Sequence, residues 1–125
     1  MRFMMLVKAG KDYEAGKPPS PELMQAVAKL GDELTKAGIM LDTGGLLPSR
    51  TGARIRVTKG KIGVIDGPFT ETKEVIGGYA VMQVSSYEEA VELGRRFMKM
   101  HMDVLGPDYE GELEIRQMYD EPPCK

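Results

Sequence analysis

Residues 66–79 have the sequence DGPFTETKEVIGGY and separate two segments whose side chains alternate as in β-strands. The first nine positions contain three carboxylates, one ammonium group and a proline whose ring fixes φ at about −65°. Gly77 and Gly78 remove the Cβ where the backbone must turn sharply or approach another group closely. Loops that concentrate charge between rigid strands often carry function, so this stretch is the first candidate for a site.

The segments on either side of this stretch predict four strands and two helices. Strand patterns occupy residues 2–8, 39–47, 79–84 and 112–119. The first helix is predicted to begin at Ser20, a capping hydroxyl followed by proline, and to end at Gly38 in a left-handed cap. The second follows a capping box, Ser86 and Glu89, and is predicted to extend to about Met102.

An inserted β-hairpin is predicted between the second and third of these strands. Residues 53–66 alternate apolar and polar side chains on both sides of a tight turn. The pattern predicts a buried face that includes Ile55 and Val57, and a wet, basic face that includes Arg54 and Arg56. We expect the hairpin to lie at a sheet edge or to project as an arm.

Without the hairpin the order is β-α-β-β-α-β, which predicts an α+β, ferredoxin-like fold. Both helices would then cover one face of the sheet. The apolar side chains that we assign to the other face are Phe3, Met5, Val7, Tyr79, Val81 and Met118. An apolar face of that size usually meets a partner. We therefore expect a homodimer that packs sheet to sheet about a two-fold axis, with a ligand cavity between the sheets.

Length and composition limit the classes of protein that fit. The chain has 125 residues, enough for one domain spanning residues 1–125, with 42% hydrophobic and 29% charged residues. The net charge of −2 argues against a nucleic acid partner. No apolar run approaches the roughly 18 residues of a membrane span, and the short apolar start argues against a signal peptide. A single cysteine, Cys124, predicts a cytoplasmic location.

The central stretch supports a resemblance to a known family. DGPFTETKE at residues 66–74, followed by GGY at 77–79, resembles the signature of the DGPF proteins, a branch of the YCII-related domain family. RFMMLVK at residues 2–8 and GELEIR at 111–116 resemble the two ends of that family. The resemblance covers nearly the whole chain and implies a dimeric α+β barrel built from ferredoxin-like units.

The resemblance implies little about activity. Members of the family are mostly uncharacterised, and some are encoded near, or fused to, extracytoplasmic-function sigma factors. Related proteins are associated with chemistry through a His–Asp pair, and other dimeric α+β barrels act on small organic molecules. Fold kinship does not choose among these functions, because function belongs to the site.

Acidic residues of the central stretch are candidates for acid–base chemistry. If two of Asp66, Glu71 and Glu74 share a dry pocket, the pKa of one is raised and it can act near neutral pH. The alternative is structural: Asp66 accepts hydrogen bonds from the turn, and the two glutamates are surface charges. Lys73 is a candidate for neutralising a bound anion, or else a solvated lysine.

His101 and Arg116, outside the stretch, and Tyr79, at its end, complete the candidate site. His101 is the only histidine, and it falls beside the apolar stripe of the second helix, as a core residue or as a group that faces a pocket. Arg116 is predicted to be buried on the face without helices, where it needs a carboxylate from the loop or from the dimer partner, or else an anionic ligand. Tyr79 offers a hydroxyl group to the same face, although packing is the simpler role.

No metal site or cofactor is expected. A single histidine, a cysteine near the end of the chain and no ligand pair at helical spacing leave only nonspecific carboxylates. No glycine-rich phosphate loop lies between a strand and a helix.

Two classes of function remain. One is a cofactor-independent enzyme that acts on a small anionic or carbonyl compound, with Asp66 and His101 as catalytic residues and Arg116 as the binding residue. The other is a binding or regulatory module associated with a sigma factor. The enzyme hypothesis predicts that the three residues converge in one pocket, and the module hypothesis predicts that they are scattered while an exposed patch persists.

Overall fold

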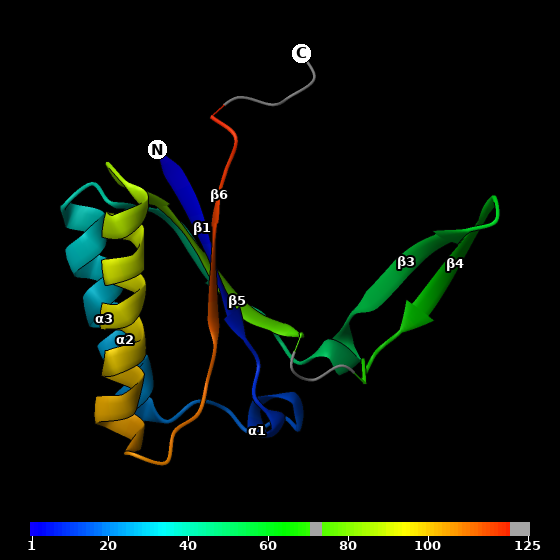
Figure 1. The fold of residues 1–125 in the computed structure, drawn as a ribbon. Coiled ribbons are helices and arrows are strands. Elements are labelled where there is room, and N and C mark those ends of the chain that lie inside the picture. The colour runs from blue at the N-terminus through cyan, green and yellow to red at the C-terminus, as the bar shows by residue number, and fades with distance from the viewer. Residues whose placement is uncertain (71–73, 121–125) are drawn as a thin grey trace.

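A four-stranded antiparallel sheet with two helices on one face forms the body of the protein (Figure 1). The computed structural model describes residues 1–70 and 74–120. The strands are β1 (Arg2–Lys8), β2 (Met40–Gly45), β5 (Ile76–Gln83) and β6 (Leu113–Gln117), in the order β2-β5-β1-β6. The helices are α2 (Pro21–Lys36) and α3 (Tyr87–Leu105), with a single turn α1 (Lys11–Glu14) before them. This α+β arrangement is compatible with the predicted ferredoxin-like order of elements.

The helices begin at the predicted residues because their first N–H groups find local acceptors. The Ser20 hydroxyl accepts from the N–H of Leu23 at 3.2 Å, and the Ser86 hydroxyl accepts from the N–H of Glu89 at 3.1 Å. Gly38 has a φ of 75°, the left-handed conformation expected just past the end of α2. The second helix continues to Leu105, a few residues beyond the predicted end.

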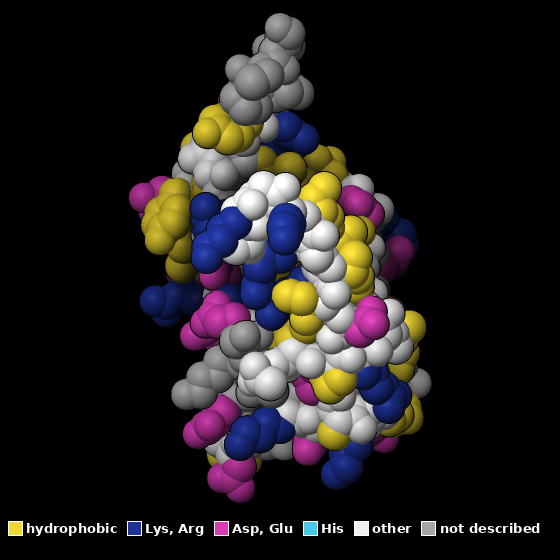
Figure 2. Space-filling view, turned by 90° about the vertical axis from the view of Figure 1, so that its right-hand side faces the viewer, with side chains coloured by type: hydrophobic (Ala, Val, Ile, Leu, Met, Phe, Trp, Pro, Cys, Tyr) yellow, Lys and Arg dark blue, Asp and Glu magenta, His cyan; other side chains and the backbone are white. Residues whose placement is uncertain are grey.

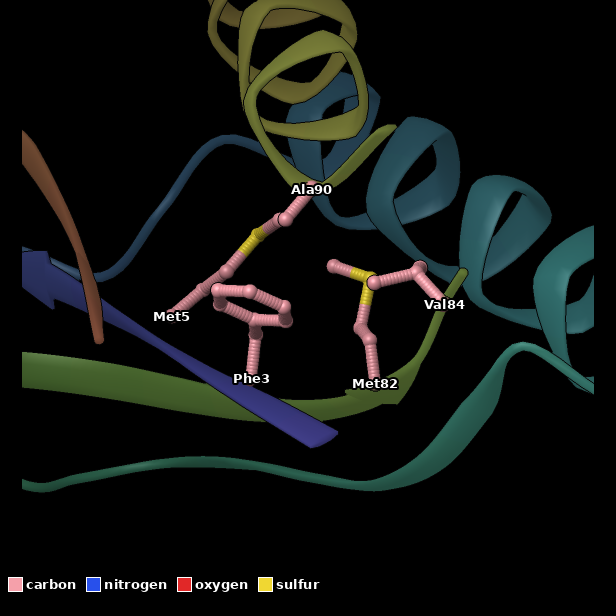
Figure 3. Close-up of a cluster of buried hydrophobic side chains, with 5 residues drawn as sticks. All are labelled: Phe3, Met5, Met82, Val84 and Ala90. Carbon is pink, nitrogen blue, oxygen red and sulfur yellow. The ribbon is translucent and has the colours of Figure 1, made fainter. Parts of the chain in front are cut away.

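The core lies between the sheet and the helices. Phe3, Met5, Met82, Val84 and Ala90 form its buried cluster, to which α3 contributes the alanine (Figure 3). The prediction that Phe3, Met5 and Val7 lie on the face without helices is therefore wrong. Both faces of β1 are apolar, so alternation shows which side chains share a face but does not show which face the helices cover.

The opposite face of the sheet has no helix over it in the described part of the chain. Register places Leu6 opposite Tyr79, and Met4 opposite both Val81 and Arg116. Residues that are directly opposite in antiparallel strands point to the same side. We call this surface the uncovered face; its half-buried apolar members are Met4, Leu6, Tyr79, Val81 and Met118. Tyr79, Val81 and Met118 had been assigned to this side correctly.

The predicted hairpin is an arm. Strands β3 (Ala53–Thr58) and β4 (Lys61–Asp66) form a separate two-stranded sheet, which projects on the side of the body opposite the helices (Figure 1). Its predicted buried face is exposed in this chain, because Ile55 and Val57 are 72% and 70% accessible to solvent. Side-chain alternation predicts that a strand is amphipathic, but the surface that covers its apolar side need not belong to the same chain.

Candidate functional site

The first residues of the central stretch, 66–69, form the base of the arm. The N–H of Gly67 donates to the carbonyl of Gly52 at 3.0 Å and closes the hairpin. A Cβ at Gly67 would overlap the carbonyl oxygen of Ser49, so this position requires glycine. The guanidinium of Arg54 lies 3.9 Å from the centre of the Phe69 ring, a cation–π contact between the arm and the stretch.

A buried serine and one carboxylate hold this base against the body. Ser49 lies in the one-turn helix η1 (Ser49–Thr51), and its hydroxyl and N–H both donate to the carboxylate of Glu14, at 2.5 and 2.7 Å. The same hydroxyl accepts from the N–H of Phe69 at 3.0 Å. The turn that Asp66 was expected to stabilise is thus anchored, at Phe69, by Ser49, which the sequence did not single out.

Charged side chains form a chain of ion pairs across one end of the uncovered face. The Lys8 ammonium group lies 3.1 Å from Glu74 and 3.4 Å from Glu114, and Arg116 lies 3.2 Å from Glu114. Hydrogen bonds from Arg116 and then from Lys8 lower the pKa of Glu114. The hydrogen bond to Glu74 is the main reason that the pKa of Lys8 is raised. The partner of Arg116 is thus a carboxylate of its own strand and not of the loop, and its side chain is 72% exposed rather than buried.

Tyr79 lies on the same face, with Leu6 between it and Glu114, because Leu6 is paired with both residues. Its hydroxyl group is 3.4 Å from a carboxylate oxygen of Asp42. A Cβ at Gly44 would come within 2.9 Å of the Tyr79 ring, so the glycine lets the ring lie flat against β2. The ring packs against its own sheet, which matches the simpler of the two predicted roles.

His101 is a packed residue of the helix layer. It is 7% exposed, its Nδ1 lies 2.9 Å from the Phe97 carbonyl oxygen, and its ring contacts Phe97 and stacks on Tyr109. Burial raises the pKa of the Tyr109 hydroxyl. These contacts match the core alternative that the sequence left open for His101.

The predicted catalytic and binding residues occupy three separate regions. Asp66 is exposed at the end of β4 in the arm, His101 is in the last turns of α3, and Arg116 is on the uncovered face. Among the described residues, no hydrogen bond, ion pair or ring contact joins any two of them. Glu74 meets Lys8, while Glu71 and Lys73 lie outside the described residues. Within one chain, the described residues do not assemble the proposed acid–base site.

A cavity of about 480 Å³ lies elsewhere, between the helices and the β2–β5 part of the sheet. Leu30 and Leu34 of α2, Phe97 of α3 and Met82 of β5 contribute to its lining. No charged side chain of the described residues lines it. Its volume falls within the range of about 300–1,000 Å³ that is typical of small-molecule sites.

Glycines on two neighbouring strands of the sheet create this space. Gly45 of β2 and Gly78 of β5 are cross-strand partners, and Gly78 is also paired with Val7, whose side chain lines the cavity. Strands β2 and β5 therefore have no side chain on the helix side in this row, and Val7 of the next strand, β1, is the first residue of the row to supply one. A Cβ added at Gly45 would meet no heavy atom within 4 Å. The sequence contains the pairs Gly44–Gly45 and Gly77–Gly78, but it does not show that Gly45 and Gly78 would lie opposite each other under the helices.

The described residues contain neither a cluster of metal ligands nor a membrane-spanning helix. In residues 1–70 and 74–120, no group of three or more His, Cys, Asp or Glu side chains is placed to hold a metal ion. None of the described helices is both long and apolar enough to cross a bilayer.

Comparison with known families matches residues 1–101 to the YCII-related domain. The match spans more than half of the chain. The chain belongs to the YCII-related domain family. The matched region contains the whole sheet except β6, together with the arm and most of α3. Both the cavity and the base of the arm are therefore built mainly from the family domain.

A relative of this chain gives no activity to compare. An uncharacterized protein of Rhizobium meliloti (strain 1021) is 29% identical over 79 residues, which are 63% of this chain and 64% of that protein. The alignment thus spans somewhat less than two thirds of the relative's length. The function has to be argued from the geometry.

Proposed function

We propose that this YCII-related protein binds a small, largely apolar molecule in the cavity between α2, α3 and the sheet. The observation that carries the proposal is the combination of about 480 Å³ of space with a lining of aliphatic, aromatic and glycine residues. Apolar surface that water leaves on binding contributes about 25 cal/mol per Å², so such a lining favours an apolar ligand.

The few polar groups near the cavity suit orientation of a ligand better than catalysis. Thr35 and Thr43 supply hydroxyl groups, and the Thr43 hydroxyl already donates to the Tyr79 carbonyl at 3.0 Å. A general acid or base must lie within hydrogen-bond reach of the proton that it transfers. Neither Asp66 nor His101 lines this cavity, which favours binding without turnover.

A fluorescent apolar probe tests the proposal. N-phenyl-1-naphthylamine should bind the wild-type chain and gain fluorescence. Gly45→Val should raise its dissociation constant at least tenfold, about 1.4 kcal/mol, because the new side chain would point into the open space. Gly63→Val is the matched control: it also lies in a strand and its Cβ would also meet nothing within 4 Å, but it is in the arm.

Two results would contradict the proposal. One is a wild-type chain that gives no fluorescence gain with the probe. The other is equal probe affinity for Gly45→Val and the wild type, which would place the probe on another surface.

The second candidate is a regulatory module of the DGPF branch, associated with a sigma factor. The observations that favour it are the separation of Asp66, His101 and Arg116 and the exposed apolar patch on the arm. The enzyme alternative, acid–base chemistry on a small anionic or carbonyl compound, would require a second chain to complete the site. Under either alternative Asp66→Asn should leave probe binding unchanged, since Asp66 does not line the cavity.

A further inference from the structure

Two glycines lie inside the described helices, and packing explains only one of them. Gly94 of α3 is required by its neighbours, because a Cβ there would come within 2.9 Å of Ile115 and 3.2 Å of Leu113. Gly31 lies in the middle of α2, where a Cβ would meet no heavy atom within 4 Å apart from the backbone of its own helix. Glycine destabilises the interior of a helix relative to alanine. The contacts of the described residues therefore give no reason for a glycine at position 31.

Gly31 lies at the centre of the helix face that lines the cavity. Its neighbours three and four positions away in both directions all line the cavity: Val27, Ala28, Leu34 and Thr35. Residues at these spacings share one face of a helix, so a side chain at position 31 would point into the same space. On the sheet side, Gly45 and Gly78 leave the backbone bare as well. The cavity is therefore bounded by backbone without side chains on both its helix wall and its sheet wall.

Three methionines and a phenylalanine also line the cavity. Met5, Met40 and Met82 belong to three different strands, and Phe97 belongs to α3. Figure 3 shows Met5 and Met82 pointing from the sheet toward the helices. Methionine sulfur atoms pack favourably on the edges of aromatic rings, and aromatic rings pack favourably on one another. A saturated molecule of the same size lacks both interactions.

The cavity is closed at the core and open at the edge of the sheet. Met5 and Met82 are 2% and 3% exposed, whereas Thr35, Thr43 and Gly45 are exposed. The opening thus lies between α2 and β2, next to the bare backbone. A flat molecule that enters edge-on at this opening passes between the bare walls toward the methionines.

We infer that the ligand of this cavity is a planar aromatic molecule and that Gly31 is a specificity-determining residue, because it keeps open the space that the ring occupies. The inference rests on the proposed function, since it names the class of ligand for the same cavity. A ring between two walls of backbone buries both of its faces, and the three thioethers are available to its edge. A side chain at position 31 would exclude the ring and leave the helix more stable.

A pair of matched competitors tests the ligand class. 4-Propylphenol and 4-propylcyclohexanol have the same number of carbon atoms and the same hydroxyl group, and they differ in the flatness and aromaticity of the ring. Each is titrated against N-phenyl-1-naphthylamine bound to the full chain. The phenol should displace the probe with a dissociation constant at least fivefold lower, about 1 kcal/mol. Burial of apolar surface alone predicts no such preference, because the saturated ring has at least as much apolar surface.

Gly31→Leu tests the residue. It should raise the dissociation constant of 4-propylphenol at least tenfold, because the new side chain would occupy the cavity. It should also raise the melting temperature by about 2–5 °C, since leucine favours the helix and fills apolar space. Gln25→Leu is the matched control: it adds the same side chain at an exposed position of α2 that does not line the cavity, and it should leave the affinity unchanged.

Exposed side chains of the arm are the competing surface for an apolar molecule. Figure 2 looks onto the side from which the arm projects and shows hydrophobic side chains at that surface. Ile62 of the arm is 74% exposed. Ile62→Lys should leave the affinities of the probe and of both competitors unchanged. Weaker binding in this variant would locate the molecules on the arm and overturn the inference.

The remaining outcomes separate the inference from the proposed function. A wild-type chain that does not bind the fluorescent probe would contradict the proposed function itself. Probe binding with equal affinities of the two competitors would leave that function in place and overturn the aromatic ligand. Unchanged affinity in Gly31→Leu would overturn the role of Gly31, and a lower melting temperature of this variant would show that the glycine serves packing instead.

Discussion

Strand β1 of the body and strand β3 of the arm each have a face with apolar side chains at every second position, although β1 is apolar on its other face too, and the two faces have opposite environments. Phe3 and Met5 of β1 are each 2% exposed under the helices, whereas Ile55 and Val57 of β3 are about 70% exposed. The same local pattern therefore contributes to the core in one region and to the surface in the other. Since burial is the main favourable term in folding, the body should hold most of the stability of the single chain.

The largest expected effect comes from truncating one side chain in each region. Phe3→Ala should lower the free energy of unfolding by about 3–5 kcal/mol, because a buried ring leaves a cavity. Ile55→Ala should change it by no more than about 0.5 kcal/mol, as expected for an exposed site. Chemical denaturation measures both free energies of unfolding. Equal losses would contradict the division into a stable body and an unsupported arm.

A smaller effect is expected at the junction of the two regions. Gly67→Ala should cost about 1–3 kcal/mol, because its Cβ would overlap the Ser49 carbonyl and the base of the arm would have to shift. Gly52, whose carbonyl accepts the hydrogen bond from Gly67, is the control position. In Gly52→Ala the Cβ would lie at an ordinary 3.6 Å from the same Ser49 oxygen. Thermal unfolding and sedimentation of both variants measure stability and association. Similar behaviour of the two would show that the arm is not fixed by this contact.

The smallest expected effect concerns the ion pairs of the uncovered face. The hydrogen bond from Arg116 is the main reason that the pKa of Glu114 is lowered. The stabilisation from this pair is therefore fully present at pH values above the usual glutamate pKa of 4.5. It is lost as the pH falls through the lowered pKa of Glu114. Arg116→Gln should raise this pKa toward its usual value, which carboxyl NMR titration measures. Lys99→Gln, a change at the Lys99–Asp103 pair on α3, should leave it unchanged. An unaltered Glu114 pKa in Arg116→Gln would show that the pair is absent in solution.

Most of the fold was predictable because its signals are local. Ser20, Ser86 and Gly38 determine helix ends through contacts within a few residues, and alternation identifies strands without knowledge of their partners. The assignment of faces failed because it is a non-local property. Met4 and Met5 are chemically identical, and only packing against Ala90 decides that Met5 faces the helices.

The candidate site was predictable only in part, for the same reason. Arg116 needed a carboxylate, and the partner, Glu114, lies two residues away. The cavity depends on Gly45 facing Gly78 across two strands, which follows from register. The arrangement of Ser49 with Glu14 joins positions 35 residues apart, and neither side chain carries a recognisable motif.

Hydrogen exchange tests the central claim most directly, because it monitors the arm and the body in one sample. The account predicts low amide protection in β3 and β4 and high protection beside Phe3 and Met82. Equal protection in the two regions would contradict it. The arm would then be as stable as the body.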